Sequence, residues 1–218
     1  MTNYTTVLWD LDGTIIDSAP GVFESFHKTF EIHGLPDVDD EQLRSFMGPP
    51  LSVTFSEKLG FSPELTEQCL TTYRDHYLNK GGALNCTLYP GVVDVIRKCQ
   101  EAGIKNSMAT SKGESGTRIV GEHFDFLKYF DVVGTATNDR IRSAKADVMS
   151  YAFDELRKIN ADLSRVILIG DRIHDIEGAR EHGVEVCLVK WGFGNENEWA
   201  QADYLVENTT ELEELLGL

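Results

Sequence analysis

The sequence predicts an α/β protein built on a parallel β-sheet, with an all-helical subdomain inserted directly after the first strand. Two observations support this fold class. Short apolar runs alternate with helical patterns over most of the chain, which is typical of a parallel sheet whose strands are connected by helices. One long stretch near the N-terminus shows helical patterns only. A helical stretch that directly follows a sheet strand indicates an insertion into the sheet domain.

Six sheet strands are expected, because six apolar runs continue without alternating polar positions, as in parallel strands that are covered on both faces. Helices are expected around residues 92–96 and 148–156, where apolar residues recur at spacings of three and four, and a final short helix is expected at 210–216. The six expected strands are residues 7–9, 105–109, 131–133, 166–169, 184–189 and 204–206.

The expected insertion covers residues 17–84. Apolar residues within it recur at helical spacing in three groups, and glycine and proline residues separate the groups. A chain of 218 residues is long enough for one large domain with such an insertion. We therefore expect residues 1–16 and 85–218 to form the α/β core, and residues 17–84 to form a helical subdomain.

The charge balance limits the classes of partner. Acidic side chains outnumber basic ones by 36 to 20, which gives a formal net charge of −16. A field of this sign repels nucleic-acid backbones and anionic lipid surfaces, so we expect neither partner. No apolar stretch approaches the roughly 20 residues of a membrane span, and no secretory signal is visible. The four cysteines lie far apart, as expected for free thiols in a reducing cytoplasm: Cys69, Cys86, Cys99 and Cys187.

Two aspartates follow the first expected strand, in the run Asp10-Leu11-Asp12-Gly13-Thr14. Ligand sites in open parallel sheets form at the carboxyl ends of the strands, so both side chains are expected at such a site. Residues two apart in an extended chain point to the same side, which brings the two carboxylates close together. Neighbouring carboxylates repel each other and require a cation or a shared proton. The alternative is a polar strand-end turn, since Asp-Gly is a frequent turn dipeptide.

A second acidic group follows the expected strand at 166–169. Asp171 comes just after this strand, and Asp175 lies one helical turn further on. Together, Asp10, Asp12 and Asp171 offer the hard oxygen ligands that Mg²⁺ prefers, with water completing the octahedral shell. The sequence therefore predicts a Mg²⁺ site at this edge of the sheet. The cation would also reverse the field that a phosphate group meets in so acidic a protein.

Polar and cationic residues are expected near the same edge. Thr110 and Ser111 follow the strand at 105–109, so their hydroxyls and free backbone N–H groups can bind phosphate oxygens. Lys145 begins a later helix, where its ammonium group can stabilise charge on a transferring phosphoryl group. Taken singly, Lys145 is also compatible with a solvated helix residue, and Thr110 with an ordinary helix cap.

In this order and spacing, the four segments resemble the haloacid dehalogenase superfamily, in the phosphatase branch that carries a helical cap after the first strand. The resemblance extends over essentially the whole chain and implies a Rossmann-like core with residues 17–84, here called the cap segment, as the cap. It implies that Asp10 is the nucleophile and Asp12 the general acid/base. Mg²⁺ would bind the Asp10 carboxylate, the Asp12 backbone carbonyl and Asp171, with Asp175 as an indirect or water-mediated partner.

On the phosphate side, the resemblance implies that Thr110, the Ser111 backbone and Lys145 hold the phosphate. Lys145-Ala146-Asp147 departs from the Lys-Pro-x-Pro-Asp form that is common in the family. The departure leaves the expected role of the lysine unchanged, but the surrounding loop is a weaker match.

Within this branch, residues 47–51 and 190–194 favour phosphoglycolate phosphatases and related hydrolases of small phosphomonoesters. We therefore expect a Mg²⁺-dependent phosphatase that forms an aspartyl phosphate on Asp10 and acts on a small phosphorylated metabolite.

Three alternatives stay open at this point. A phosphomutase would use the same acids. A phosphonate hydrolase would require a lysine from the cap segment, such as Lys28 or Lys58. A phosphoacceptor module without turnover is the alternative from a different class. A dehalogenase is disfavoured, because it would require neither Asp12 nor Asp171. The leaving group, the oligomeric state and the role of His174 are not indicated by the sequence.

Overall fold

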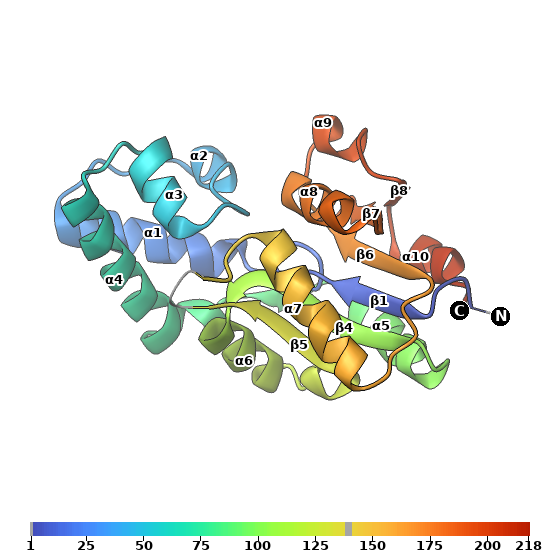
Figure 1. Ribbon diagram of the computed structural model, residues 1–218. Coiled ribbons are helices and arrows are strands. Elements are labelled where there is room, and N and C mark those ends of the chain that lie inside the picture. The colour runs from blue at the N-terminus through green and yellow to red at the C-terminus, as the bar shows by residue number, and fades with distance from the viewer. Residues whose placement is uncertain (1, 138–140) are drawn as a thin grey trace.

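The computed structural model describes residues 2–137 and 141–218, and its centre is a six-stranded sheet with helices on both faces (Figure 1). The strand order is β5-β4-β1-β6-β7-β8, and every neighbouring pair is parallel. All six predicted strands are present, so the predicted fold class is confirmed. The strands are β1 (Thr6–Trp9), β4 (Lys105–Gly113), β5 (Val132–Ala136), β6 (Val166–Gly170), β7 (Glu185–Val189) and β8 (Tyr204–Val206).

Two apolar clusters cover the two faces of the sheet. Successive side chains of a strand point to opposite faces, so Trp9 of β1 enters one cluster and Leu8 enters the other. Helices α5 (Val92–Glu101) and α10 (Thr209–Leu216) contribute to the cluster around Trp9. Helices α7 (Lys145–Lys158) and α8 (Ile173–His182) contribute to the cluster around Leu8. Burial on both sides explains why the strands have continuous apolar runs.

The core helices match the predicted pattern, and α10 begins one residue before its expected start. The bounds are α5 (Val92–Glu101), α6 (Glu114–His123), α7 (Lys145–Lys158), α8 (Ile173–His182), α9 (Glu196–Trp199) and α10 (Thr209–Leu216), with a 3₁₀ turn at Leu127–Tyr129. Every helix in the described parts of the chain is too short or too polar to cross a membrane.

The cap segment is helical and lies beyond the carboxyl ends of the strands, at the left of Figure 1. The ring of Phe26 is at the centre of its core, because four other aromatic rings have their centroids 5.0 to 5.9 Å from it: Phe30, Phe46, Phe55 and Tyr73. Its elements are α1 (Ala19–His33), α2 (Asp40–Arg44), α3 (Leu51–Val53), a π-helical turn (Thr54–Lys58), α4 (Pro63–Asn79) and a 3₁₀ turn (Gly82–Leu84).

A two-stranded antiparallel ribbon joins the two ends of the cap segment. It consists of β2 (Ile16–Asp17) and β3 (Thr87–Leu88), with Ile16 opposite Leu88. These two strands were not predicted from the sequence, because a strand of two residues is too short to show a pattern of apolar positions. The ribbon holds the chain entering and leaving the cap segment close together, next to the end of β1. The division of the chain into a core and a separate cap remains a prediction.

Candidate active site

A cavity of about 360 Å³ lies between the carboxyl ends of the strands and the cap segment. This is the place where open parallel sheets bind ligands. A larger depression of about 790 Å³ lies at the opposite ends of β1 and β6, but the carboxylate cluster of the described residues is not in it. The smaller cavity is lined by every site residue that the sequence predicted and by Asp175: Asp10, Asp12, Thr110, Ser111, Lys145, Asp171 and Asp175.

Three buried carboxylates form the floor of the cavity. One oxygen each of Asp10, Asp171 and Asp175 lies within 4.8 Å of the others. Burial raises the pKa of Asp10 to about 6, although the adjacent Lys145 ammonium opposes the shift. Burial, together with the charges of Asp175 and Asp10, holds the pKa of Asp171 well above its usual range. Clustered carboxylates of this kind are stabilised by a cation.

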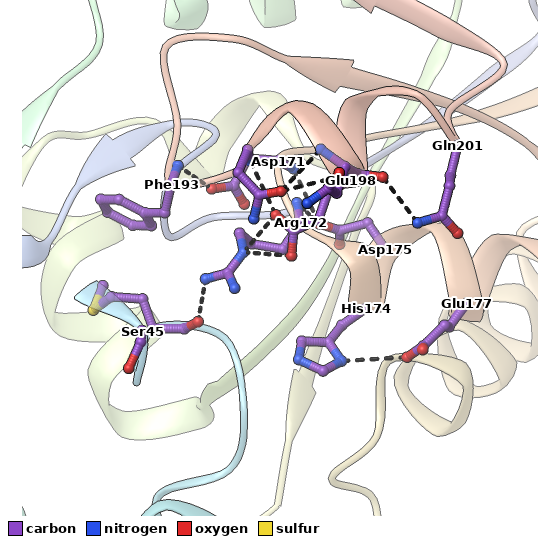
Figure 2. A network of polar contacts seen from close by, with 12 residues as sticks. Ser45, Asp171, Arg172, His174, Asp175, Glu177, Phe193, Glu198 and Gln201 are labelled. Carbon is purple, nitrogen blue, oxygen red and sulfur yellow. Dashed lines mark hydrogen bonds and ion pairs between the residues drawn. The ribbon is translucent and has the colours of Figure 1, made fainter. Parts of the chain in front are cut away.

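The Asp171 carboxylate provides a direct test of whether a metal ion fits. Its Oδ2 accepts a hydrogen bond of 2.6 Å from the backbone N–H of Phe193, as Figure 2 shows. Its Oδ1 is buried and has no hydrogen-bond partner among the described residues. Buried polar atoms are almost always satisfied, so this oxygen is positioned to ligate a cation. The donor set, carboxylate oxygens without histidine or cysteine, fits Mg²⁺.

Glycines allow the chain to approach the Asp171 carboxylate closely. Gly13 has φ +85°, and a Cβ atom there would lie 2.0 Å from Asp171 Oδ2. A Cβ atom on Gly192 would lie 2.4 Å from the Asp171 Cβ. These contacts give a physical reason for the glycine in Asp12-Gly13 and for part of the 190–194 segment, whose role the sequence did not indicate.

The Asp12 side chain lies outside the carboxylate cluster. Its two oxygens accept hydrogen bonds of 2.8 and 3.1 Å from Lys112 Nζ. The same ammonium donates to the Tyr77 hydroxyl at 2.5 Å and lies 4.7 Å from the centre of that ring. Burial lowers the pKa of Lys112, but the Asp12 charge, Tyr77 and the hydrogen bonds to both residues together outweigh burial, so the pKa of Lys112 is raised overall. Tyr77 belongs to α4, so this contact connects β4 with the cap segment.

Lys145 is buried at the start of α7, so the solvated alternative for this residue does not hold. Its Nζ donates to Asp10 Oδ1 at 2.6 Å and to the Ala109 carbonyl at 2.7 Å, and lies 2.8 Å from Asp175 Oδ1. Burial lowers the pKa of Lys145. The charges of Asp10 and Asp175, with the hydrogen bonds to them, outweigh the effect of burial, so the pKa is raised overall. Gly178 of α8 leaves room for the lysine side chain, since a Cβ atom there would lie 2.6 Å from Lys145 Cγ.

Thr110 and Ser111 lie in the carboxyl-terminal part of β4 and line the cavity. Thr110 is buried, and its Oγ1 accepts a hydrogen bond of 3.1 Å from the backbone N–H of Lys112, which leaves its own hydroxyl proton free to donate. Strand β4 is longer than predicted and continues through both residues to Gly113, which pairs with Ala136 after a register shift.

Arg172 forms a second contact between the core and the cap segment. Its Nε lies 3.2 Å from both carboxylate oxygens of Glu198 (Figure 2). Its Nη1 donates to the backbone carbonyl of Met47. His174 also lines the cavity, with its Nδ1 3.3 Å from Glu177 Oε2. The contacts of Arg172 could not be predicted from the sequence, because Glu198 and Met47 lie far from Arg172 along the chain.

Comparison with known proteins agrees with this geometry. The family model for haloacid dehalogenase-like hydrolases matches residues 7–189. The chain is 32% identical to "Tyrosine-protein kinase PtkA" of Mycobacterium tuberculosis, over 97% of this chain and 72% of that protein. It is 29% identical to a 5'-nucleotidase of Pseudomonas aeruginosa, over 89% of this chain and 86% of that enzyme.

Among solved structures, the crystal structure of a "predicted phosphatase" from Clostridium acetobutylicum matches with a TM-score of 0.89 and 32% identity, over 99% of both chains. The family model spans most of this chain, and the structural match extends through the core and the cap segment. The chain therefore belongs to the haloacid dehalogenase-like hydrolase family and is an enzyme of its phosphatase branch.

Proposed function

We propose that this enzyme is a Mg²⁺-dependent phosphatase that transfers the phosphoryl group of a small, phosphoglycolate-like phosphomonoester to Asp10 and then hydrolyses the aspartyl phosphate. The observation that carries the proposal is the position of Asp10. Its carboxylate lines the cavity, is held by Lys145 at 2.6 Å and belongs to the buried carboxylate cluster.

Asp10 and Asp171, with the backbone carbonyl of Asp12, are the proposed metal ligands, and Asp175 lies close enough to act directly or through water. Bound there, Mg²⁺ would neutralise charge on the nucleophile and on the phosphate oxygens. Lys145 supplies a further positive charge, because its ammonium contacts the nucleophile and can also stabilise charge on the phosphoryl group.

In the first half of the reaction, a carboxylate oxygen of Asp10 attacks phosphorus, and the bond from phosphorus to the leaving oxygen breaks. Asp12 donates a proton to that leaving oxygen. Thr110 and the Ser111 backbone hold the phosphate oxygens in place. In the second half, Asp12 takes a proton from water, the resulting hydroxide attacks phosphorus, and the carboxylate of Asp10 is released together with inorganic phosphate.

The cap segment is proposed to exclude bulk water from these steps. Two hydrogen bonds connect it to the core. Lys112 donates to the Tyr77 hydroxyl, and Arg172 donates to the Met47 carbonyl. Active-site lids act in this way, because an aspartyl phosphate must be protected from uncontrolled hydrolysis. Residues 17–84 are therefore proposed as the cap, and residues 1–16 and 85–218 as the catalytic core.

The competing reactions have less support. The lysines that line the cavity, within residues 2–137 and 141–218, are Lys112 and Lys145, and both come from the core. Lys28 pairs with Glu31 on the surface, and Lys58 donates to the Ser45 carbonyl, so neither is placed to form a Schiff base with a phosphonate substrate. All four cysteines are free, which agrees with the proposed cytoplasmic location.

A panel of phosphomonoesters assayed with Mg²⁺ tests the proposal. We expect release of inorganic phosphate, with the substrates ranked by kcat/KM and small metabolite esters near the top. Product analysis distinguishes a phosphatase from a phosphomutase, because a mutase returns an isomeric phosphate ester. Absence of phosphate release from every ester, with metal present, would contradict the proposal.

A further inference from the structure

The cap segment supplies one cation to the cavity, and its position bears on the leaving group of the substrate. Arg74 of α4 lines the cavity and is exposed. It forms no hydrogen bond or ion pair with any residue in the described parts of the chain. An arginine guanidinium stays charged at all physiological pH values, so an unpaired positive charge faces the cavity.

The other lysine and arginine side chains that line the cavity, within residues 2–137 and 141–218, are already paired. Lys112 forms an ion pair with Asp12, and Lys145 forms ion pairs with Asp10 and Asp175. Arg172 forms an ion pair with Glu198. Acidic residues outnumber basic ones by 36 to 20 in this chain, so carboxylate partners are abundant. Arg74 nevertheless has none among the described residues, so its guanidinium is available to an anionic ligand in the cavity.

The helix places Arg74 near the leaving-group end of the cavity. Tyr73, Arg74, Tyr77 and Leu78 of α4 all line the cavity, as residues on one helix face do. The Tyr77 hydroxyl accepts a hydrogen bond from Lys112. Lys112 also donates to Asp12, which is the proposed acid for the leaving oxygen. Arg74 lies three residues before Tyr77 in α4, about 4.5 Å from it along the helix axis. Arg74 and the Tyr77–Lys112–Asp12 contact therefore belong to the same cavity, and the leaving oxygen is the part of the substrate that Asp12 is proposed to protonate.

Most of the cavity wall that the cap segment contributes is uncharged. Neighbouring cavity walls in the cap segment are formed by side chains with no charge: Phe46, Met47, Pro49, Leu51 and Leu78. Apolar walls offer a ligand no competing charged partner, so Arg74 is the charged group of the cap segment that a ligand meets in the cavity. A guanidinium in such a wall favours planar, bidentate anions such as carboxylates.

We propose that Arg74 binds a second anionic group on the leaving group, so that the preferred substrates are phosphomonoesters of short acids. This assignment rests on the proposed function and specifies its substrate class. The core would bind the phosphoryl group of every substrate, and Arg74 would distinguish leaving groups that carry a carboxylate from neutral ones.

The test uses two pairs of esters that differ in one charge. The aromatic pair is 4-carboxyphenyl phosphate and 4-carbamoylphenyl phosphate, and the aliphatic pair is phosphoglycolate and 2-hydroxyethyl phosphate. The measured quantity is the ratio of kcat/KM for the anionic ester to that for its neutral partner. In Arg74→Gln, we expect this ratio to fall by about 10- to 100-fold, the size of a lost charged hydrogen bond.

Lys80→Gln is the matched control. It removes the same charge just after α4, from a side chain that is exposed, pairs with Asp75 and does not line the cavity. The control should leave the ratio unchanged. Arg74→Glu provides the reverse test, because it should favour ethanolamine phosphate, whose leaving group is cationic, over 2-hydroxyethyl phosphate.

The outcomes separate the two proposals. If the wild-type enzyme hydrolyses the esters but Arg74→Gln leaves the ratio unchanged, the Arg74 assignment is wrong and the phosphatase proposal stands. The same conclusion follows if Arg74→Gln and Lys80→Gln lower the ratio equally. If no ester releases phosphate, the phosphatase proposal fails and the Arg74 assignment fails with it.

Discussion

The core and the cap segment contribute different kinds of side chain to the same cavity. The core contributes charged groups that are buried and paired with one another, such as Lys145 between Asp10 and Asp175. The cap segment contributes apolar side chains and the unpaired Arg74. We propose from this difference a division of labour in which the core performs the chemistry and the cap segment selects the leaving group. Perturbing the two regions should therefore have effects of different size and kind.

Removing the metal should have the largest effect on the core. We expect complete loss of phosphatase activity with a chelator and full recovery on addition of Mg²⁺, since the Asp10 and Asp171 carboxylates require a cation. Ca²⁺ should inhibit, because its larger and looser coordination shell would misplace the nucleophile. Mg²⁺ should also raise Tm, because it binds only the folded state. Full activity in excess chelator would contradict the metal assignment.

The next largest effect is expected for Lys145. Lys145→Met keeps most of the side-chain volume but removes the ammonium, and kcat should fall by about a hundredfold or more. Lys158→Met is the control, because Lys158 ends the same helix on the surface. Near-normal kcat in Lys145→Met would show that the three contacts of this ammonium are structural only.

Gly13→Ala should weaken Mg²⁺ binding by about 10-fold or more, since displaced metal ligands and their supports typically cost that much affinity. The added Cβ atom would lie 2.0 Å from Asp171 Oδ2 and would push the carboxylate away. Gly103→Ala separates this effect from backbone strain, because Gly103 has a similar φ of +81° and no neighbouring atom within 4 Å of a Cβ atom. Calorimetric titration with Mg²⁺ measures both variants. Equal Mg²⁺ affinities of the two variants would show that the close approach of Gly13 to the Asp171 carboxylate does not support metal binding.

The smallest effect is expected at the contact between the two regions. Tyr77→Phe removes the hydroxyl that accepts from Lys112 but keeps the ring over the ammonium. The loss of one hydrogen bond should lower kcat about 3- to 10-fold. Tyr73→Phe is the control, because Tyr73 stacks on Tyr77 and its hydroxyl does not contact Lys112. If Tyr77→Phe and Tyr73→Phe lower kcat equally, the Lys112–Tyr77 contact does not position Asp12.

Local patterns were sufficient to predict the sheet and the acidic motifs. A parallel strand buried on both faces has a continuous apolar run, and the acids directly after such strands must lie at one edge of the sheet. The six strands and the common location of Asp10, Asp171 and Thr110 followed from these two rules. The roles assigned to these residues remain predictions.

Contacts between distant segments could not be predicted in this way. The burial of Lys145 depends on Gly178 in another helix, and the pairing of Asp12 with Lys112 depends on Tyr77 in the cap segment. Neither partner is recognisable from spacing along the chain. Arg74 has no sequence signal at all, since its significance depends on the absence of a partner within the folded cavity.

The central claim is that Asp10 carries the phosphoryl group and Asp12 moves the protons. Asp12→Asn with p-nitrophenyl phosphate tests both roles. The acidic leaving group needs little protonation, so the first half of the reaction should proceed. The second half should stall, because no base activates the water.

We predict a burst of about one equivalent of p-nitrophenolate per enzyme, followed by slow release, with the phosphate found on Asp10 by mass measurement of rapidly quenched protein. Asp10→Asn should give neither a burst nor a phosphorylated protein. Steady-state turnover of Asp12→Asn at the wild-type rate, or a phosphate located on a residue other than Asp10, would contradict the account.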